Sequence, residues 1–314
     1  MTDRLPPLTA LRAFEAAARH MSFARAADEL NVTPAALSFQ IKSLEEHLGA
    51  QVFKRLNRAV ALTEVGQTLA PGMSEGFERL NATWRATRRL LDGQILNVTA
   101  GPAFTALWLA PRLYEFAQAH PEIELRFSAA LRMMDFDRDD IDVAIRFGYA
   151  RDDGLFSKRL IDEYLTPAIT PALAARFPTP ESLLRAPLIH DDSVKFLNPP
   201  AGWRQWFAAH GIDAPPLHGV RFSNADHAVN AALAGTGVLL GRSSLAAMAV
   251  ADGRLVAPCD LALGTGASFR FLCPKGAEDR PQIAAFLAWI SGEVGRYGNF
   301  MSDKRIVTPA HRDV

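Results

Sequence analysis

The chain of 314 residues contains little cysteine and no long apolar run. Its two cysteines, Cys259 and Cys273, are too few for a disulfide framework and lack the spacing of metal ligands. We therefore expect two reduced thiols, with a redox switch as the alternative. No segment approaches the roughly 18 consecutive apolar residues of a membrane span. The opening segment MTDRLPPL carries Asp3 and no apolar core, which is unlike a signal peptide, so we expect a cytoplasmic protein with no membrane partner.

The chain also lacks an excess of charge of either sign. It holds 34 Lys and Arg against 34 Asp and Glu, and its first 95 residues hold 12 against 10. A bulk basic field is thereby excluded, and any nucleic-acid binding must come from the local placement of charges. The hydrophobic content of 49% is typical of a globular protein, and the length predicts two or three domains.

Signatures of catalysis are absent as well. There is no G-x-S-x-G elbow, no H-E-x-x-H and no P-loop, so we expect no enzyme activity, no metal and no cofactor. His190-Asp191-Asp192 is the one tempting cluster, but three adjacent residues do not generally converge as a catalytic triad. The alternative is an α/β enzyme or a solute-binding receptor with a helical N-terminal extension, and a free receptor would need an export signal.

Two kinds of pattern divide the chain. Residues 9–92 have helical periodicity with one short interruption, whereas residues 95–298 alternate amphipathic helices with short apolar runs such as 95–101, 123–127 and 141–148. That alternation predicts a doubly wound α/β domain. We expect a winged helix-turn-helix over 1–62, a linker helix over 63–92, an α/β domain over 93–298 and a poorly ordered tail over 299–314.

Residues 21–49 have the pattern of a helix-turn-helix. Ser22 is a suitable N-cap for a short first helix. After a turn at Asn31-Val32, Thr33 caps a second helix that has Pro34 at its first position, where a missing N–H costs nothing. Gly49 is suited to end that second helix.

The second helix has two distinct faces. Leu37, Ile41, Leu44 and Leu48 are spaced as one buried stripe. The opposite face has small residues and Lys42, which suits a DNA major groove, and Phe39 there can pack on a thymine methyl. Residues 51–66 resemble a hairpin wing whose basic side chains would hold phosphates. The predicted DNA-contacting residues are Ser22, Thr33, Pro34, Ala35, Ser38, Phe39, Lys42, Lys54, Arg55 and Arg58.

An apolar seam follows from Thr63 onward. It consists of Val65, Leu69, Met73, Phe77, Leu80, Trp84 and Leu91, which share one side of a long helix. A helix this long in a small domain needs a partner, so the seam predicts a contact between two copies of the chain. Packing on the chain's own winged domain alone is the alternative.

Five stretches carry a resemblance to a known family. They are LPPLTALRAFEAAARHMSFARAADELNVTPAALSFQIKSLEEHLGAQVFKR (5–55), WLAPRL (108–113), FDRDDIDVAIRFG (136–148), GWRQWF (202–207) and AALAGTGVLLGRSSLAAMAVADGRLVAP (231–258). On these the chain resembles the LysR-type transcriptional regulators, in the branch of the glycine-cleavage activator and the β-lactamase regulator. The resemblance implies a regulator that binds promoter DNA as a homodimer or as a dimer of dimers (a homotetramer), with RNA polymerase as a further partner. It also implies a two-lobed, periplasmic-binding-protein-like α/β effector domain that binds a small molecule.

Two departures from that family bear on what the protein binds. On the recognition helix the family commonly has Gln and then His or Arg, where this chain has Pro34 and Phe39, so two polar base readers are absent. After the first strand of the effector domain the family tends to have hydroxyl residues that grip an effector carboxylate, where this chain has Gly101 and Ala103. We therefore expect an effector with a sizeable apolar or aromatic part rather than a small carboxylate.

The effector site is expected in a cleft between two lobes, because ligands of open α/β sheets lie beyond the carboxyl ends of the strands. One lobe would comprise 95–165 plus 270–295, and the other 166–269. The predicted effector-binding residues are Gly101, Pro102, Ala103, Phe104, Phe147, Gly148, His190, Ser223, Asn224 and Asp226. Arg146 is either a ligand clamp or the partner of Asp140 or Asp142.

Overall fold

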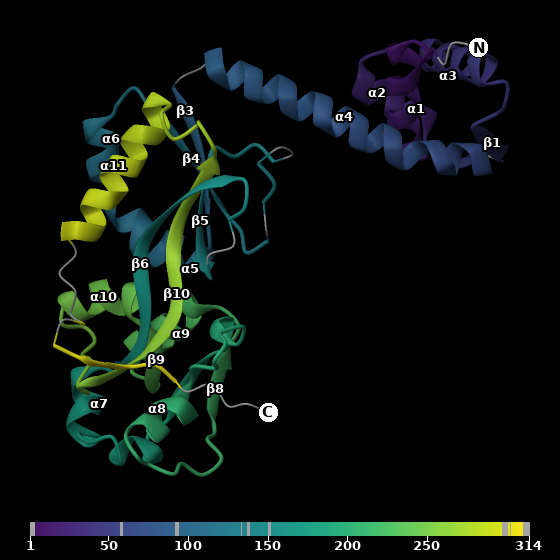
Figure 1. The fold of residues 1–314 in the computed structure, drawn as a ribbon. Coiled ribbons are helices and arrows are strands. Elements are labelled where there is room, and N and C mark those ends of the chain that lie inside the picture. Colours follow the sequence, from purple (N-terminus) through teal and green to yellow (C-terminus); the bar gives the residue numbers. More distant parts are fainter. Residues whose placement is uncertain are drawn as a thin grey trace. The chain divides into compact units, whose positions relative to one another are not determined.

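The computed structural model describes residues 4–56, 59–91, 94–132, 134–136, 139–149, 152–296, 301 and 303–309 (Figure 1). These residues form two compact units, one within Met1–Leu91 and one that holds nearly all of the later residues. The first unit is a winged helix-turn-helix followed by a long helix, and the second is a two-lobed α/β domain.

The first unit begins with three helices and a hairpin: α1 (Leu8–His20), α2 (Phe23–Leu30), α3 (Pro34–Leu48), β1 (Phe53–Leu56) and β2 (Ala59–Leu62). The helix starts follow from local chemistry. Ser22 Oγ accepts a hydrogen bond from the Arg25 N–H at 3.4 Å, and Thr33 Oγ1 accepts one from the Ala36 N–H at 3.2 Å. Gly49 ends α3 in the left-handed conformation with φ 72°. The predicted caps and the antiparallel hairpin are therefore confirmed.

The core of this unit joins the helices to the hairpin. Phe14 of α1 and Phe53 of β1 have ring centroids 5.5 Å apart, and Phe23 meets Phe53 edge-on at 5.2 Å. Leu37, Ile41 and Leu44 of α3 are buried in the same cluster. The sequence pattern was wrong about Leu48, which is 46% exposed because it is the last residue of α3 and lies past the end of this cluster.

Helix α4 (Glu64–Leu91) begins in close contact with the wing. Thr63 N–H donates to the Val52 carbonyl at 3.0 Å, and Thr63 Oγ1 accepts from the Gly66 N–H at 3.1 Å. A Cβ atom at Gly66 would lie 2.2 Å from that same Val52 oxygen. Only glycine allows the first turn of α4 to approach the backbone before β1 so closely.

The apolar seam of α4 divides into two parts. Leu69, Met73 and Phe77 pack against the core of the winged unit. Further along, Leu80 and Trp84 are exposed, Trp84 to 66%. The first part of the seam therefore stabilises the chain's own winged unit, and the second part has no cover among the residues that the structure describes.

The second unit is built on one sheet in the order β4-β3-β5-β10-β6-β9-β7-β8, with β11 beside β10. Its strands are β3 (Ile95–Ala100), β4 (Glu124–Ala129), β5 (Val143–Gly148), β6 (Leu155–Ala168), β7 (Leu188–Asp191), β8 (Gly219–Phe222), β9 (Val238–Arg242), β10 (Leu261–Pro274) and β11 (Arg305–Val307). Its helices are α5 (Pro102–Phe104), α6 (Leu113–Ala119), α7 (Pro171–Arg176), α8 (Trp203–Ala209), α9 (Ala225–Leu233), α10 (Ser243–Ala251) and α11 (Pro281–Arg296). A π-helical turn η1 (Thr105–Leu109) and 3-10 turns η2 (Ala110–Arg112), η3 (Ser182–Arg185) and η4 (Asp192–Val194) complete it.

The sheet divides into two lobes that share two long strands. Parallel strands β3, β4 and β5 belong to lobe one, and parallel strands β7, β8 and β9 belong to lobe two. Strands β6 and β10 pair with each other and run through both lobes (Figure 1). The register of β10 against β6 shifts between Gly264 and Ser268, where Gly266 has φ 67°. The predicted two-lobed α/β fold is confirmed.

Aromatic side chains fill the core of each lobe. Phe104 stacks on Trp108 and on Phe269, with ring centroids 5.0 Å and 4.2 Å apart. In lobe two, Trp203 and Trp206 are buried in a separate cluster, and Trp206 Nε1 donates to the Leu261 carbonyl at 3.2 Å. Within the described part of the chain, no helix is both long and apolar enough to cross a membrane.

The C-terminal segment differs from the expectation. The pattern of 299–314 predicts a poorly ordered tail, but Arg305–Val307 form strand β11, which pairs in parallel with Leu261–Leu263 of β10. Lys304 Nζ donates to the carbonyls of Ala257 and Cys259 at 2.9 Å and 2.5 Å. The expectation is wrong for this strand because its stability comes from a partner strand about forty residues away, and local periodicity carries no record of such a partner.

The contact between α4 and the wing makes a testable prediction. Gly66→Ala should destabilise the winged unit by about 1–3 kcal/mol, because the added methyl overlaps a backbone oxygen that cannot move independently. The matched control is Gly72→Ala on the same helix, where no heavy atom lies within 4 Å. The control should stabilise by about 0.5–1 kcal/mol through helix propensity. Hydrogen–deuterium exchange over residues 10–53 of the full chain measures the change in stability of the winged unit in both variants. Equal effects of the two variants would contradict the close approach of Gly66 to the Val52 oxygen.

Candidate DNA-binding surface and effector cavity

The outward face of α3 is the candidate DNA-reading surface. Exposed along it are Pro34, Ala35, Phe39 and Lys42, and Ser38 is half-buried. Phe39 is 69% exposed. Lys42 lies 3.6 Å from Glu46 one turn further on, and both side chains are largely solvent-exposed. Such a pair contributes little to stability and leaves the ammonium accessible.

The remaining predicted DNA contacts are two helix caps and the basic residues of the hairpin. Ser22 is half-buried and Thr33 is exposed, and both side chains already serve as helix caps. Lys54 is exposed on β1, and Arg55 follows it on the same strand. Arg58 lies outside the described residues.

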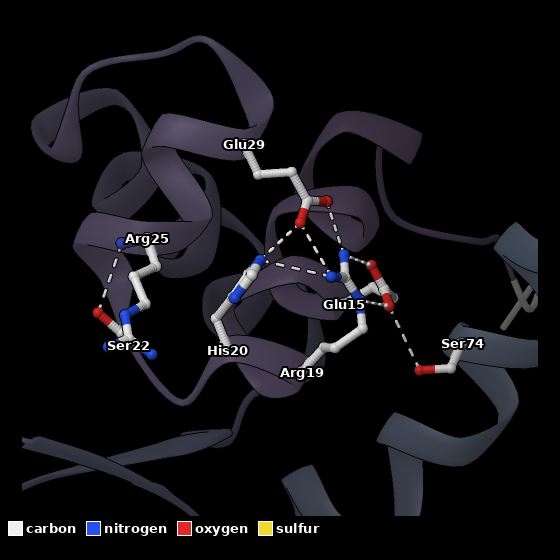
Figure 2. A network of polar contacts seen from close by, with 7 residues as sticks. All are labelled: Glu15, Arg19, His20, Ser22, Arg25, Glu29 and Ser74. Atoms are coloured by element: carbon white, nitrogen blue, oxygen red, sulfur yellow. Dashed lines mark hydrogen bonds and ion pairs between the residues drawn. The ribbon is translucent and has the colours of Figure 1, made fainter.

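A polar network joins the helices that support α3 (Figure 2). Arg19 of α1 donates to both carboxylate oxygens of Glu29 on α2, at 2.6 Å and 2.9 Å, and to Glu15 at 2.9 Å. His20 Nε2 lies 2.5 Å from Glu29, and Ser74 of α4 donates to Glu15 at 3.4 Å. The bidentate Arg19 guanidinium, followed by His20, lowers the pKa of Glu29 from 4.5 to about 2. The network therefore links α1, α2 and α4, and sequence reasoning missed it because its members are spread over sixty residues.

A cavity of about 280 Å³ lies between the two lobes of the effector domain. Lobe one lines it with Gly101, Pro102, Ala103, Phe104, Ala130, Leu131, Ile145, Arg146 and Phe147. Lobe two lines it with Ser193, Phe196, Ser223, Asn224, Ala225, Asp226 and Arg242, and β10 contributes Phe269. Eight of the ten effector residues predicted from the sequence are brought together here.

The two other predicted residues lie elsewhere. Gly148 is buried at the end of β5, and a Cβ atom there would lie 3.7 Å from Arg270. His190 lines a separate cavity of about 190 Å³ with Asp192 and Arg221, and burial, followed by the charge of Arg221, lowers its pKa. The structure therefore does not bring these two residues together with the other eight. Asp191, the neighbour of His190, also lines the second cavity, and its carboxylate lies 3.6 Å from the cation of the main cavity.

That cation is Arg242, which the sequence analysis did not select. Its side chain is only 8% exposed, and its Cζ atom lies 4.9 Å from the centre of the Phe147 ring. Nη2 donates to Ser193 Oγ at 3.2 Å, and Nε lies 3.6 Å from Asp191 Oδ2. A guanidinium is thus held by lobe-two partners against an aromatic ring of lobe one, at the wall of the cavity.

A signal for Arg242 exists in the sequence. It is the last residue of the strand VLLGR, and the rule that ligands gather at the carboxyl ends of strands would have selected it. Phe196 and Phe269 have no comparable signal. Phe196 comes from an irregular segment, and Phe269 comes from the strand that crosses between lobes.

Arg146 also lines the cavity, although its hydrogen bonds are long. Its guanidinium donates to Thr99 Oγ1 at 3.3 Å and to the Ala130 carbonyl at 3.4 Å. Burial, together with the charge of Arg132, lowers its pKa. No ion pair between Arg146 and Asp140 or Asp142 is found among the described residues, and Asp142 instead accepts a hydrogen bond from the Asn97 N–H at 2.9 Å.

A buried carboxylate lies at the lobe crossing. Glu163 of β6 accepts hydrogen bonds from the hydroxyls of Ser243 and Ser244 and from the Ser244 N–H at the start of α10. Thr265 of β10 donates to the Glu163 carbonyl at 2.7 Å. Burial raises the pKa of Glu163, and the charge of Arg242 opposes that shift. Glu163 therefore joins both crossing strands to the helix that follows Arg242.

The two cysteines are buried. Burial raises the pKa of Cys259 to about 11 and that of Cys273 to about 12. Both thiols are therefore protonated at neutral pH, and the thiolate that a redox switch requires is scarce. Their environment favours the expectation of two reduced thiols over the alternative.

The chain combines a winged helix-turn-helix, a long helix and a two-lobed domain with a central cavity. This combination defines a class, the one-component transcription regulators, in which one polypeptide both binds DNA and senses a small molecule. Comparison with known proteins agrees. Residues 8–67 match the model of the bacterial regulatory helix-turn-helix protein, lysR family, and residues 91–295 match the LysR substrate binding domain. The chain belongs to the LysR family of transcriptional regulators.

Individual relatives support the predicted branch. The chain is 39% identical to the glycine cleavage system transcriptional activator of Escherichia coli K12, over 92% of this chain and 94% of that protein. It is 36% identical to the HTH-type transcriptional activator AmpR of Pseudomonas aeruginosa, over 90% and 94% of the two chains. The solved effector domain of that AmpR superposes with a TM-score of 0.54 at 28% identity, covering 64% of this chain and 96% of that one. The branch named from the sequence is confirmed.

The network around Glu29 predicts a pH-dependent contribution to the stability of the winged unit. The pKa of Glu29 is lowered from 4.5 to about 2, so its contribution is present in full above pH 4.5 and is lost as the pH falls toward 2. Because Glu29 is partly solvent-exposed, we expect about 1 kcal/mol or less. Glu29→Gln should therefore lower the stability of the winged unit at pH 7, and the deficit should shrink below pH 4.5 and disappear as the pH approaches 2.

Glu46→Gln on α3 is the control for this prediction, because Glu46 has only its exposed partner Lys42. It should change stability little at either pH. Hydrogen–deuterium exchange of the full chain at several pH values gives the comparison, and a Glu29→Gln deficit that persisted unchanged to pH 3 would contradict the charge-based explanation.

Proposed function

We propose that this regulator binds promoter DNA through α3 and the wing, and that a small molecule in the inter-lobe cavity controls its activity. The observation that carries the proposal is a cavity lined from both lobes at the point where β6 and β10 cross between them. A ligand that touches both lobes favours one relative position of the lobes over others. We propose that the protein acts in the cytoplasm, because the promoter DNA that it binds lies there.

On the DNA side, we assign α3 to the major groove and the wing to the phosphates. Lys42 and the wing residues Lys54, Arg55 and Arg58 would supply charge at the places where the backbone approaches. Such contacts set affinity and register, whereas base-edge contacts from the outward face of α3 set sequence preference. This division suits a chain with no overall positive charge.

On the effector side, we infer a ligand with an apolar or aromatic body and an anionic end. Phe104, Phe147, Phe196 and Phe269 supply apolar wall, and Gly101 and Ala103 offer no side-chain hydroxyl. Ser223, Asn224 and Asp226 at the start of α9 supply polar groups from lobe two. Arg242 is the buried cation that an anionic end would meet.

We further propose that the protein is a homodimer, or a dimer of dimers, formed through the exposed part of the α4 seam. Leu80 and Trp84 are large, exposed apolar side chains on α4, whereas Leu69, Met73 and Phe77 of the same helix pack in the winged unit. Exposed apolar surface of this kind marks a contact site. RNA polymerase is a further partner of the DNA-bound assembly.

The control of DNA binding by an effector is tested with the full chain and pools of candidate metabolites. An aromatic carboxylate that binds should raise the melting temperature, since a hundredfold excess over Kd stabilises by about 2.7 kcal/mol. The same compound should alter the DNase footprint upstream of neighbouring genes. Arg242→Lys should weaken its binding at least tenfold, by about 1.4 kcal/mol, because the forked, ring-stacked guanidinium is lost.

The matched control for the cavity is Arg221→Lys in the second cavity, which should leave the response unchanged. If compact amino acids stabilise the protein and aromatic carboxylates do not, the inferred ligand class is wrong. If no ligand alters the footprint, control through the cavity is wrong.

The seam predicts the oligomeric state. Trp84→Glu should reduce the sedimenting mass at micromolar concentration, because a charge buried in an apolar contact costs several kcal/mol. Tyr114→Glu is the control, since Tyr114 is an equally exposed aromatic residue on the effector domain, 72% accessible. A folded Trp84→Glu protein with the mass of the wild type would remove this seam from the interface.

A further inference from the structure

Phe39 is an aromatic residue without a structural role in the winged unit. Phe14, Phe23 and Phe53 pack on one another in its core, and Phe77 of α4 packs against that core. Phe39 is 69% exposed, and no aromatic ring packs on it among the described residues. Removing so large an apolar side chain from water would be favourable, so its exposure in the free protein points to a contact made on binding.

The neighbours of Phe39 limit what that contact can be. Across the first two turns of α3 the exposed side chains are Pro34, Ala35, Ala36 and Phe39, and none of them has a hydrogen-bonding group. Ser38 and Gln40 are half-buried, and the first exposed polar side chain within α3 is Lys42. Thr33 at the N-cap is exposed, but its hydroxyl oxygen already accepts a hydrogen bond from the Ala36 N–H. The N-terminal half of α3 can therefore read a base edge through apolar contact, while the charge lies one turn further on.

In the major groove, one base presents an apolar group. Thymine carries a C5-methyl, whereas guanine, adenine and cytosine present acceptors and donors that would lose water against an aromatic ring without gaining a partner. We propose that Phe39 is a specificity-determining residue that selects thymine in each half-site by packing on this methyl. The same group makes 5-methylcytosine acceptable there, because its methyl occupies the same ring position. This inference rests on the proposed role of α3 as the DNA-reading helix.

The test begins with sites selected from random duplexes by the full chain. At one position of each half-site the selected sequences should contain thymine. Replacing that thymine by deoxyuridine removes only the methyl, and should weaken binding by about fourfold per half-site, or about fifteenfold for a dimer on two half-sites. Replacing the T·A pair by C·G should weaken binding further, and 5-methylcytosine in place of that cytosine should restore about fourfold.

Three variants separate Phe39 from its surroundings. Phe39→Ala should bind the thymine and deoxyuridine duplexes with nearly equal affinity and should no longer select thymine from the random pool. Lys42→Ala should weaken binding to both duplexes alike and keep their ratio, because a phosphate contact does not sense the methyl. Leu48→Ala removes an exposed apolar side chain at the other end of the same helix, and should also keep the ratio.

The outcomes distinguish this inference from the function on which it rests. If the full chain selects a defined sequence but tolerates deoxyuridine at every thymine, Phe39 does not read the methyl and the inference is overturned. The same holds if Phe39→Ala binds DNA like the wild type with an unchanged thymine-to-deoxyuridine ratio, which would assign the ring to a protein partner. If no sequence is selected from the pool at all, the proposed function of α3 fails first.

Discussion

Strands β6 and β10 pass through both lobes and pair with each other on both sides of two register shifts, and the rest of the effector domain depends on this continuity. Because the two lobes share these strands, the carboxyl ends of the parallel strands in both lobes face one cavity. The same strands carry Glu163 and Thr265, which connect to the start of α10 just after Arg242. The cavity wall and the lobe crossing are thus parts of one hydrogen-bonded structure.

The winged unit depends on a comparable constraint at smaller scale. Its recognition helix is held by α1 and α2, which are tied by the Arg19–Glu29 pair, and its wing is held by the close approach of Gly66 to Val52. The first feature is an ion pair and the second is a close backbone contact, and neither involves side chains on the outward face of α3. The fold therefore does not depend on those side chains. Position 39 on this surface can therefore hold Phe39 in place of a polar residue without loss of the fold.

Local chemistry made much of the fold predictable from the sequence. Ser22, Thr33 and Gly49 mark helix ends by the backbone groups they satisfy, and the spacing of Leu37, Ile41 and Leu44 marks the buried side of α3. Strand ends were predictable too, which is why eight of the ten selected effector residues share the cavity. The prediction failed where the deciding partner is distant, as for β11, and local pattern did not separate the two cavities, since His190 lies at a strand end but lines the second one.

The sequence by itself determined the family, the helix-turn-helix with its capped recognition helix, and the two-lobed α/β class. It also determined most of the cavity residues at the strand ends. These features follow from neighbours within one or two turns or strands. Tertiary structure decided which side chains meet. It placed Arg242 of lobe two over Phe147 of lobe one and divided the seam of α4 into covered and exposed parts. Such contacts join residues tens of positions apart, and their geometry is set by the strand crossing and by helix packing, neither of which leaves a periodic trace in the chain.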